Sequence, residues 1–113
     1  MSGNSRYHVR AVHCDHRASA DDIYAALVRA TAPLTGAWAK LKRARRIGIK
    51  FSGGRPADTA VRYEGRLLEL TSEEIVRATL RLLREQTSAD LVCLETSVHK
   101  KPTDPHPKYV FTF

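Results

Sequence analysis

The chain has few cysteines, no long apolar run and no internal repeat, and each absence excludes a class of protein. Its two cysteines, Cys14 and Cys93, are too few for a disulfide framework or a four-cysteine zinc site. No apolar run approaches the roughly 18 residues that a membrane span needs. The first residues also lack the apolar segment of a secretory signal. We therefore expect a cytoplasmic protein with reduced thiols, no membrane association and no cofactor.

The composition that remains is that of an ordinary globular domain. The chain has 113 residues, of which 42% are hydrophobic and 27% are charged, and this balance is typical of one folded domain. We expect residues 1–98 to form a single α/β domain and residues 99–113 to form a proline-rich tail. The end of this tail, residues 109–113, alternates in a way that predicts a short terminal strand.

Hydrophobic spacing predicts three strands. In residues 7–14, Val9, Ala11 and His13 share one face, and residues 46–51 alternate in the same way. Residues 90–95 form an almost continuous apolar run, which is typical of a strand covered on both faces.

Two helices are expected between these strands. Ser19 and Thr71 are each followed three positions later by a carboxylate, Asp22 and Glu74, in the pattern of a capping box. Pro33 should end the first helix near residue 31, and the second should end around residues 87–88.

The two connections carry weaker signals. Residues 36–45 are expected to form a short basic connection in which Trp38 and Leu41 pack on the core. Residues 61–67 alternate around Glu64 and Gly65, a pattern that fits a small hairpin.

The order of these elements predicts the fold. Strand, helix, strand, helix, strand is the pattern of an α/β protein with right-handed crossovers. We expect a small three-layer βαβαβ unit with a mainly parallel sheet of three strands, extended by the short C-terminal strand. Because three strands make a small sheet, a homodimer or a larger parent protein is a further expectation.

The carboxyl edge of this sheet is the first candidate site, because open α/β sheets bind ligands there. Glycines after the second strand can point backbone N–H groups at an anion, and neighbouring cations would add charge. We predict a site for a small anionic ligand from residues that follow the second and third strands: Lys50, Ser52, Gly53, Gly54, Arg55, Thr71 and Glu95. The residues predict neither a reaction nor a catalytic group, and we expect no catalytic activity in this chain alone.

Histidine and cysteine near the first strand are candidate metal ligands. His13, Cys14 and His16, with Glu95 and His99, offer the imidazole, thiolate and carboxylate groups that suit zinc. Their spacing matches no recognised site, and adjacent strand residues point to opposite faces. We therefore predict no metal site, and no nucleophilic role for Cys14.

Positive charge is concentrated in one segment. Residues 36–66 hold nine basic and two acidic side chains, which equals the net charge of +7 of the whole chain. One interpretation is a solvated stretch after a helix, where cations suit the helix C-terminus. The functional alternative is a non-enzymatic basic module that binds nucleic acid or an acidic partner through residues 40–66. Its residues would be Lys40, Lys42, Arg43, Arg45 and Arg46.

The motifs also resemble a known family. The segments 21–30, 46–50, 71–84 and 90–95, in this order, are similar to the opening of proteins that carry domain of unknown function 362. In that family, a strand ending in a Lys-Pro-Asn-like motif precedes a threonine-capped helix and a strand that ends in an acidic residue. The resemblance covers residues 7–97 and implies a shortened or truncated member, an α/β fold and a ligand at the carboxyl edge.

The chain departs from the family pattern at two points. Lys50 fits the family's lysine, but Phe51 and Ser52 stand where the family has proline and asparagine. Family members are also associated with a cysteine-rich iron–sulfur segment. This chain has only two cysteines, far apart in the sequence, so the resemblance implies no iron–sulfur cluster here. The resemblance implies no particular reaction.

Overall fold

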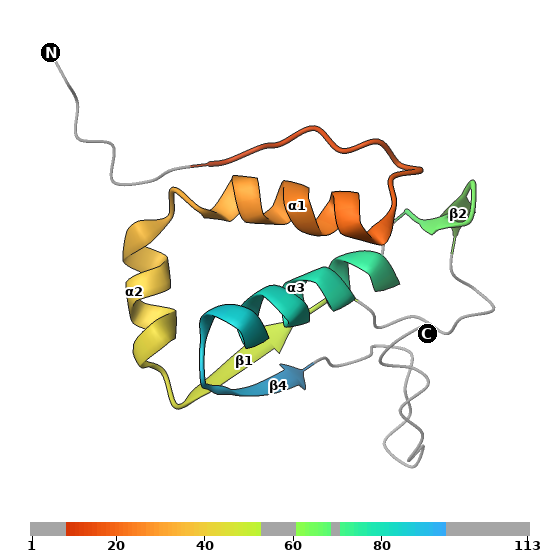
Figure 1. Cartoon of the computed structure of the whole chain (residues 1–113). Coiled ribbons are helices and arrows are strands. Elements are labelled where there is room, and N and C mark those ends of the chain that lie inside the picture. Colours follow the sequence, from red (N-terminus) through yellow and green to blue (C-terminus); the bar gives the residue numbers. More distant parts are fainter. Residues whose placement is uncertain (1–8, 53–60, 69–70, 95–113) are drawn as a thin grey trace, which may run out of the picture.

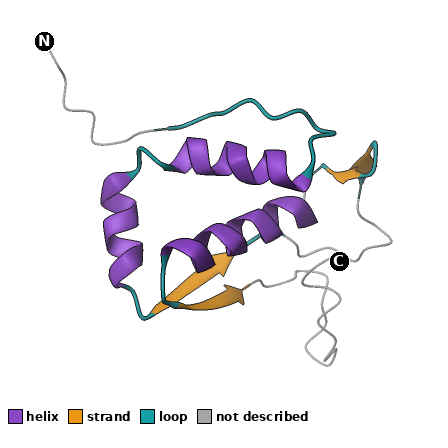
Figure 2. Cartoon of the chain, viewed as in Figure 1, coloured by secondary structure: helices purple, strands orange, loops and turns teal. Residues whose placement is uncertain are grey.

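The computed structural model describes residues 9–52, 61–68 and 71–94, which form a mixed α/β unit (Figures 1 and 2). The elements within these ranges are α1 (Ala20–Thr31), α2 (Thr35–Arg43), β1 (Arg46–Lys50), β2 (Arg62–Tyr63), β3 (Arg66–Leu67), α3 (Glu73–Gln86) and β4 (Asp90–Leu94). None of the helices in this part of the chain has the length and apolar content that a membrane crossing requires.

Strands β1 and β4 form a parallel sheet, as predicted. Their register runs from Arg46 opposite Asp90 to Lys50 opposite Leu94, so both strands end at the same edge. Helix α3 packs between α1 and this sheet (Figure 1). The sheet therefore brings the ends of two distant segments together, which is what the candidate site at the carboxyl edge requires.

The core lies between the sheet and the helices. Ile47, Leu83 and Ala89 form a buried cluster, and partly buried apolar side chains pack against it: Trp38, Leu41, Ala44, Ile49 and Leu91. The predicted packing of Trp38 and Leu41 on the core is confirmed. The other face of the sheet carries Leu94, whose side chain is 55% exposed. The apolar run of β4 predicted a strand covered on both faces, but the described residues leave the Leu94 face of the sheet partly exposed.

The three-strand prediction is not confirmed. Residues 9–14, the described part of the expected first strand, form no strand and run alongside α1 (Figure 1). Val9, on the face expected to be buried, is 94% exposed, whereas Val12 is half-buried and lines a hollow with Ile23. This segment lies against a helix and pairs with no strand of the described ranges, and Arg10 donates a hydrogen bond to the Ala30 carbonyl at 3.4 Å.

The first predicted helix is confirmed at both ends. The Ser19 hydroxyl accepts a hydrogen bond from the Asp22 N–H at 3.1 Å, which satisfies one of the free N–H groups of the first turn. The helix ends at Thr31, two residues before Pro33.

The predicted N-cap of the second helix is wrong by one residue. Ser72, not Thr71, is the N-cap of α3, and its side chain makes no capping hydrogen bond. The Thr71 hydroxyl instead accepts from the Ser52 N–H at 3.2 Å. Thr71 therefore joins the start of α3 to the end of β1.

The prediction of a short connection at residues 36–45 is wrong, because most of this segment belongs to helix α2. The Leu34 side chain gives it no cap, and the sequence has no start signal there. Contacts with other parts of the chain stabilise the helix. Trp38 Nε1 donates to the Thr31 carbonyl at 2.9 Å, and Trp38 and Leu41 pack on the core. Tertiary contacts thus stabilise a segment whose local signals favour a loop.

The hairpin around Glu64 and Gly65 is confirmed. Strands β2 and β3 pair in antiparallel register, and φ is 45° at Glu64 and 81° at Gly65. Two positive φ angles are the signature of the tight turn that joins short hairpin strands. The predicted tail, residues 99–113, and its terminal strand lie outside the described residues.

Candidate functional site

Three residues of the predicted anion site lie together at the carboxyl edge of β1. Lys50 Nζ donates to the Ser52 hydroxyl at 3.3 Å. Ser52 and Thr71 exchange two hydrogen bonds, one from the Thr71 N–H to the Ser52 carbonyl at 2.7 Å and one from the Ser52 N–H to the Thr71 hydroxyl at 3.2 Å. These hydrogen bonds fix the chain where it leaves β1 and hold the polar groups of Lys50, Ser52 and Thr71 close together.

The rest of the predicted anion site, Gly53, Gly54, Arg55 and Glu95, lies outside the described residues. Leu94, which precedes Glu95, is in register with Lys50. The first turn of α3 carries Glu73 and Glu74. These carboxylates complement the positive end of the helix dipole and weaken its attraction for a free anion.

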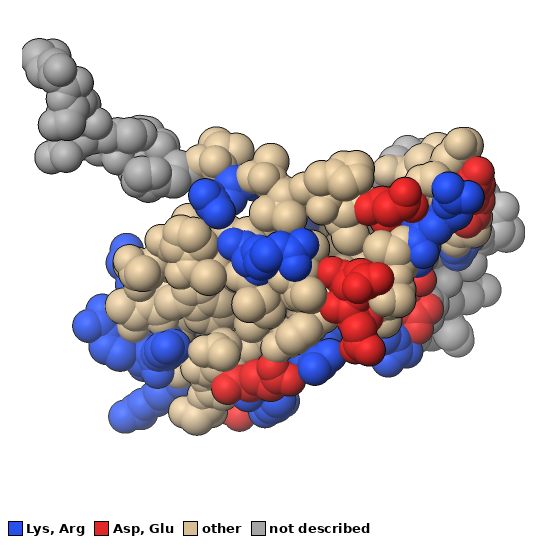
Figure 3. All heavy atoms as spheres, turned by 45° about the horizontal axis from the view of Figure 1, so that its top comes forward, with Lys and Arg blue, Asp and Glu red and all other residues tan. Residues whose placement is uncertain are grey.

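Helix α2 and the turn into β1 carry the predicted basic residues on the surface. We call Lys40, Lys42, Arg43, Arg45 and Arg46 the basic face; all five are exposed. Trp38 and Leu41 anchor α2 to the core, and Lys40, Lys42 and Arg43 of the same helix remain exposed to solvent. Figure 3 shows lysine and arginine gathered at the end of the molecule that α2 occupies.

Most of the basic face lacks a neutralising partner. Arg46 lies 3.9 Å from the Asp90 carboxylate. In the described part of the chain, no carboxylate lies within 4 Å of Lys40, Lys42, Arg43 or Arg45. Helix α2 also has no acidic residue in its first turn. The cations of the basic face are therefore exposed to solvent and accessible to an external anion.

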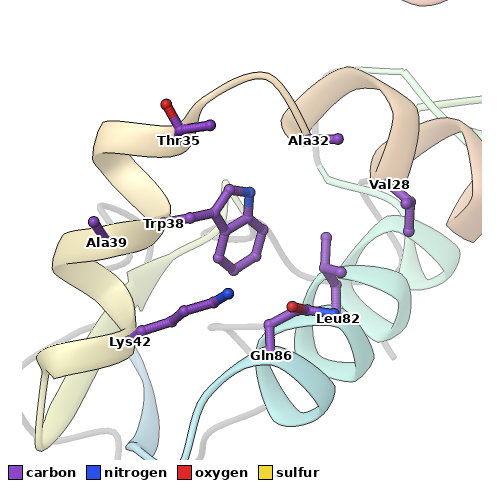
Figure 4. Close-up of a pocket in the computed structure, with 8 residues that line it drawn as sticks. All are labelled: Val28, Ala32, Thr35, Trp38, Ala39, Lys42, Leu82 and Gln86. Carbon is purple, nitrogen blue, oxygen red and sulfur yellow. The ribbon is translucent and has the colours of Figure 1, made fainter.

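A pocket of about 450 Å³ lies beside the basic face, between α1, α2 and α3 (Figure 4). Its walls are mainly apolar, with the indole of Trp38 at its centre. The lining residues are Val28, Ala32, Thr35, Trp38, Ala39, Lys42, Leu82 and Gln86. The sequence does not predict this pocket, because Trp38 has the character of a core residue and residues 36–45 carry no signal for a helix.

The described histidine and cysteine candidates, His13, Cys14 and His16, belong to no metal-binding cluster of described residues. His16 Nε2 contacts the Glu64 carboxylate, and its ring lies 5.4 Å from that of Tyr63. Among the described residues, no three histidine, cysteine or acidic side chains are grouped to hold a metal. Glu95 and His99 lie outside the described ranges. His16 thus links the loop before α1 to the hairpin.

A second polar cluster joins α1 to α3. The Tyr24 hydroxyl donates to the Glu85 carboxylate, which raises the pKa of Tyr24 and lowers the pKa of Glu85. Arg81 donates to Glu85 at 3.0 Å and stacks over the Tyr24 ring at 3.8 Å. These groups satisfy one another, so we interpret the cluster as a link between helices.

Comparison with known proteins identifies no relative of this chain. The chain matches no protein-family model, no curated protein and no solved structure. The resemblance to domain of unknown function 362 therefore stays a prediction.

Proposed function

We propose that this protein is a non-enzymatic module that binds nucleic acid through the basic face. The proposal rests on one observation, the cluster of exposed cations at Lys40, Lys42, Arg43 and Arg45 with no carboxylate within 4 Å in the described residues. Cations in this state can contact phosphates and release the counterions condensed on them, which is the main source of non-specific affinity for nucleic acid.

The helix dipole alone does not explain this charge. Cations stabilise a helix C-terminus only within its last turn. Lys40, Lys42 and Arg43 lie in the last turn of α2, but Arg45 and Arg46 lie beyond its end. Five cations in seven residues, with no acidic residue between them, exceed what the dipole requires and suit a polyanion.

Contacts with phosphates, not bases, should dominate the binding. Base recognition needs aromatic stacking surfaces or a helix that reads a groove. Trp38, the aromatic residue of α2, faces the pocket and donates its N–H to the Thr31 carbonyl. We therefore expect affinity that depends strongly on salt and weakly on sequence.

The test is a titration of a labelled 20-base-pair duplex, followed by fluorescence anisotropy at several salt concentrations. Five phosphate contacts predict a slope of about −4.5 in log K against log salt, which is about 500-fold weaker binding at ~200 mM than at ~50 mM salt. Changing Lys40, Lys42 and Arg43 to Gln should reduce the slope by about 2.7.

A matched control removes the same charge from the opposite end of the molecule. Arg17, Arg62 and Arg77 lie before α1, on β2 and in the first half of α3, away from α2 (Figure 1). Changing these three to Gln should leave the slope at the wild-type value of about −4.5. Equal losses in the two triple variants would show that only net charge matters and would contradict the proposal.

The carboxyl edge of the sheet supports a second candidate, a site for a small anion. The contact of Lys50 Nζ with the Ser52 hydroxyl and the register of Lys50 with Leu94 favour it. It is also the site that the resemblance to domain of unknown function 362 implies. Inorganic phosphate, titrated by calorimetry, should bind more weakly to Lys50→Ala and equally to the variant that lacks Lys40, Lys42 and Arg43. Unchanged binding to Lys50→Ala would contradict this site.

A further inference from the structure

The pocket between α1, α2 and α3 has the properties of a small-molecule site. Its volume of about 450 Å³ lies within the range of roughly 300–1,000 Å³ that such sites occupy. Val28, Ala32, Ala39 and Leu82 give it apolar walls, and the Trp38 ring lies among them (Figure 4). A lining of this kind favours a ligand with an apolar body, because burial of that body removes apolar surface from water.

The polar groups of the pocket indicate the charge of the ligand. Lys42 reaches in from α2 and Gln86 from α3, and Figure 4 shows the Lys42 ammonium and the Gln86 side-chain amide facing each other. The Lys42 ammonium has no carboxylate within 4 Å in the described part of the chain. An ammonium next to a side-chain amide offers donors that match a carboxylate.

The indole of Trp38 supplies surface and not a further donor. Its N–H already donates to the Thr31 carbonyl at 2.9 Å, which fixes the ring against the end of α1. A rigid aromatic side chain with its N–H satisfied can contact a ligand without losing further rotamer freedom.

We propose that this pocket binds a small organic acid, with the apolar body against Trp38 and Leu82 and the carboxylate at Lys42 and Gln86. The inference does not depend on nucleic-acid binding. It uses one residue of the basic face, Lys42, which lies at the border between the two surfaces.

Trp38 makes the proposal directly measurable. It is the single tryptophan of the chain, so its emission reports on the pocket alone. The probes are 3-phenylpropanoate and octanoate, each compared with the alcohol of the same carbon skeleton. We expect a saturable change in Trp38 emission with both acids, and binding of the alcohols that is about tenfold weaker because the charge-assisted hydrogen bonds are lost.

Two variants and one control locate the binding. Lys42→Gln should weaken acid binding about tenfold and remove the preference over the alcohol. Lys40→Gln removes the same charge from the same helix outside the pocket lining, and should leave the affinity for acid within about twofold, since exposed charges are strongly screened. Ala39→Leu adds three carbon atoms to the lining of the pocket and should weaken the binding of both the acids and the alcohols.

Several results would overturn the proposal. These are no saturable change with either acid, equal affinity for acid and alcohol, an equal effect of Lys40→Gln and Lys42→Gln, or full binding by Ala39→Leu with helical circular dichroism unchanged. A chain that binds the duplex as expected but does not respond to the acids would refute the pocket alone. The reverse result would refute only the nucleic-acid proposal.

Discussion

Truncation of Leu83 tests which face of the parallel sheet holds the core. Leu83 is 7% exposed and clusters with Ile47 and Ala89. Removing a buried leucine side chain leaves a cavity and costs about 2–5 kcal/mol. Leu94, on the other face of the sheet, is 55% exposed, and Leu94→Ala should cost less than about 1 kcal/mol because the residue already contacts water.

Urea unfolding followed by circular dichroism measures the difference. With a slope of about 2 kcal/mol per molar urea, Leu83→Ala should lower the midpoint by at least ~1 M, whereas Leu94→Ala should leave it within ~0.5 M. Equal shifts in the two variants would refute the assignment of the core to the helix side. A Leu94→Ala effect that grows with protein concentration would instead reveal a homodimer through the exposed face.

Three further predictions concern the helix link, a cap and the hairpin turn. The hydrogen bond to Glu85 raises the pKa of Tyr24. The contribution of this bond to stability is therefore complete below the ordinary tyrosine pKa and lost as pH rises through the raised value. The difference in phenolate absorbance between wild type and Tyr24→Phe should show this late titration. The pKa of Glu85 is lowered, so its contribution is complete above the ordinary glutamate pKa and lost as pH falls through the lowered value, and acid unfolding of Glu85→Gln should lack this step. Ser19→Ala should cost about 1 kcal/mol in urea unfolding through loss of the α1 cap, and Ala20→Ser should not. Gly65→Ala should cost about 1 kcal/mol because φ is 81° there with open space around the added Cβ; no loss would contradict the turn.

Local signals in the sequence predicted the elements whose stability is itself local. The hydroxyl of Ser19 and the ring of Pro33 fix the two ends of α1. The pair Glu64 and Gly65 accepts the positive φ angles of the hairpin turn. The apolar runs of β1 and β4, separated by an amphipathic helix, predicted the parallel pairing that the structure contains.

Elements that depend on distant contacts were not predictable in this way. Alternation in residues 7–14 favours a strand, but a strand forms only where a partner edge is available, and this segment lies along α1. Helix α2 depends on the packing of Trp38 and Leu41 and on a bond from Trp38 to Thr31.

The same distinction applies to the candidate sites. The basic face was predictable because charge is visible in the composition of one short segment, residues 40–46. The pocket was not, since Val28, Trp38 and Leu82 come from three helices that meet only in the folded chain. Its single charged residue, Lys42, has no local pattern that separates it from Lys40.

The salt dependence of duplex binding by the Lys40, Lys42 and Arg43 triple variant, measured beside the Arg17, Arg62 and Arg77 triple variant, tests the proposed function most directly. The proposal predicts a slope of about −1.8 for the first variant and about −4.5 for the second, as for wild type. Identical slopes for the two variants would contradict binding through the basic face.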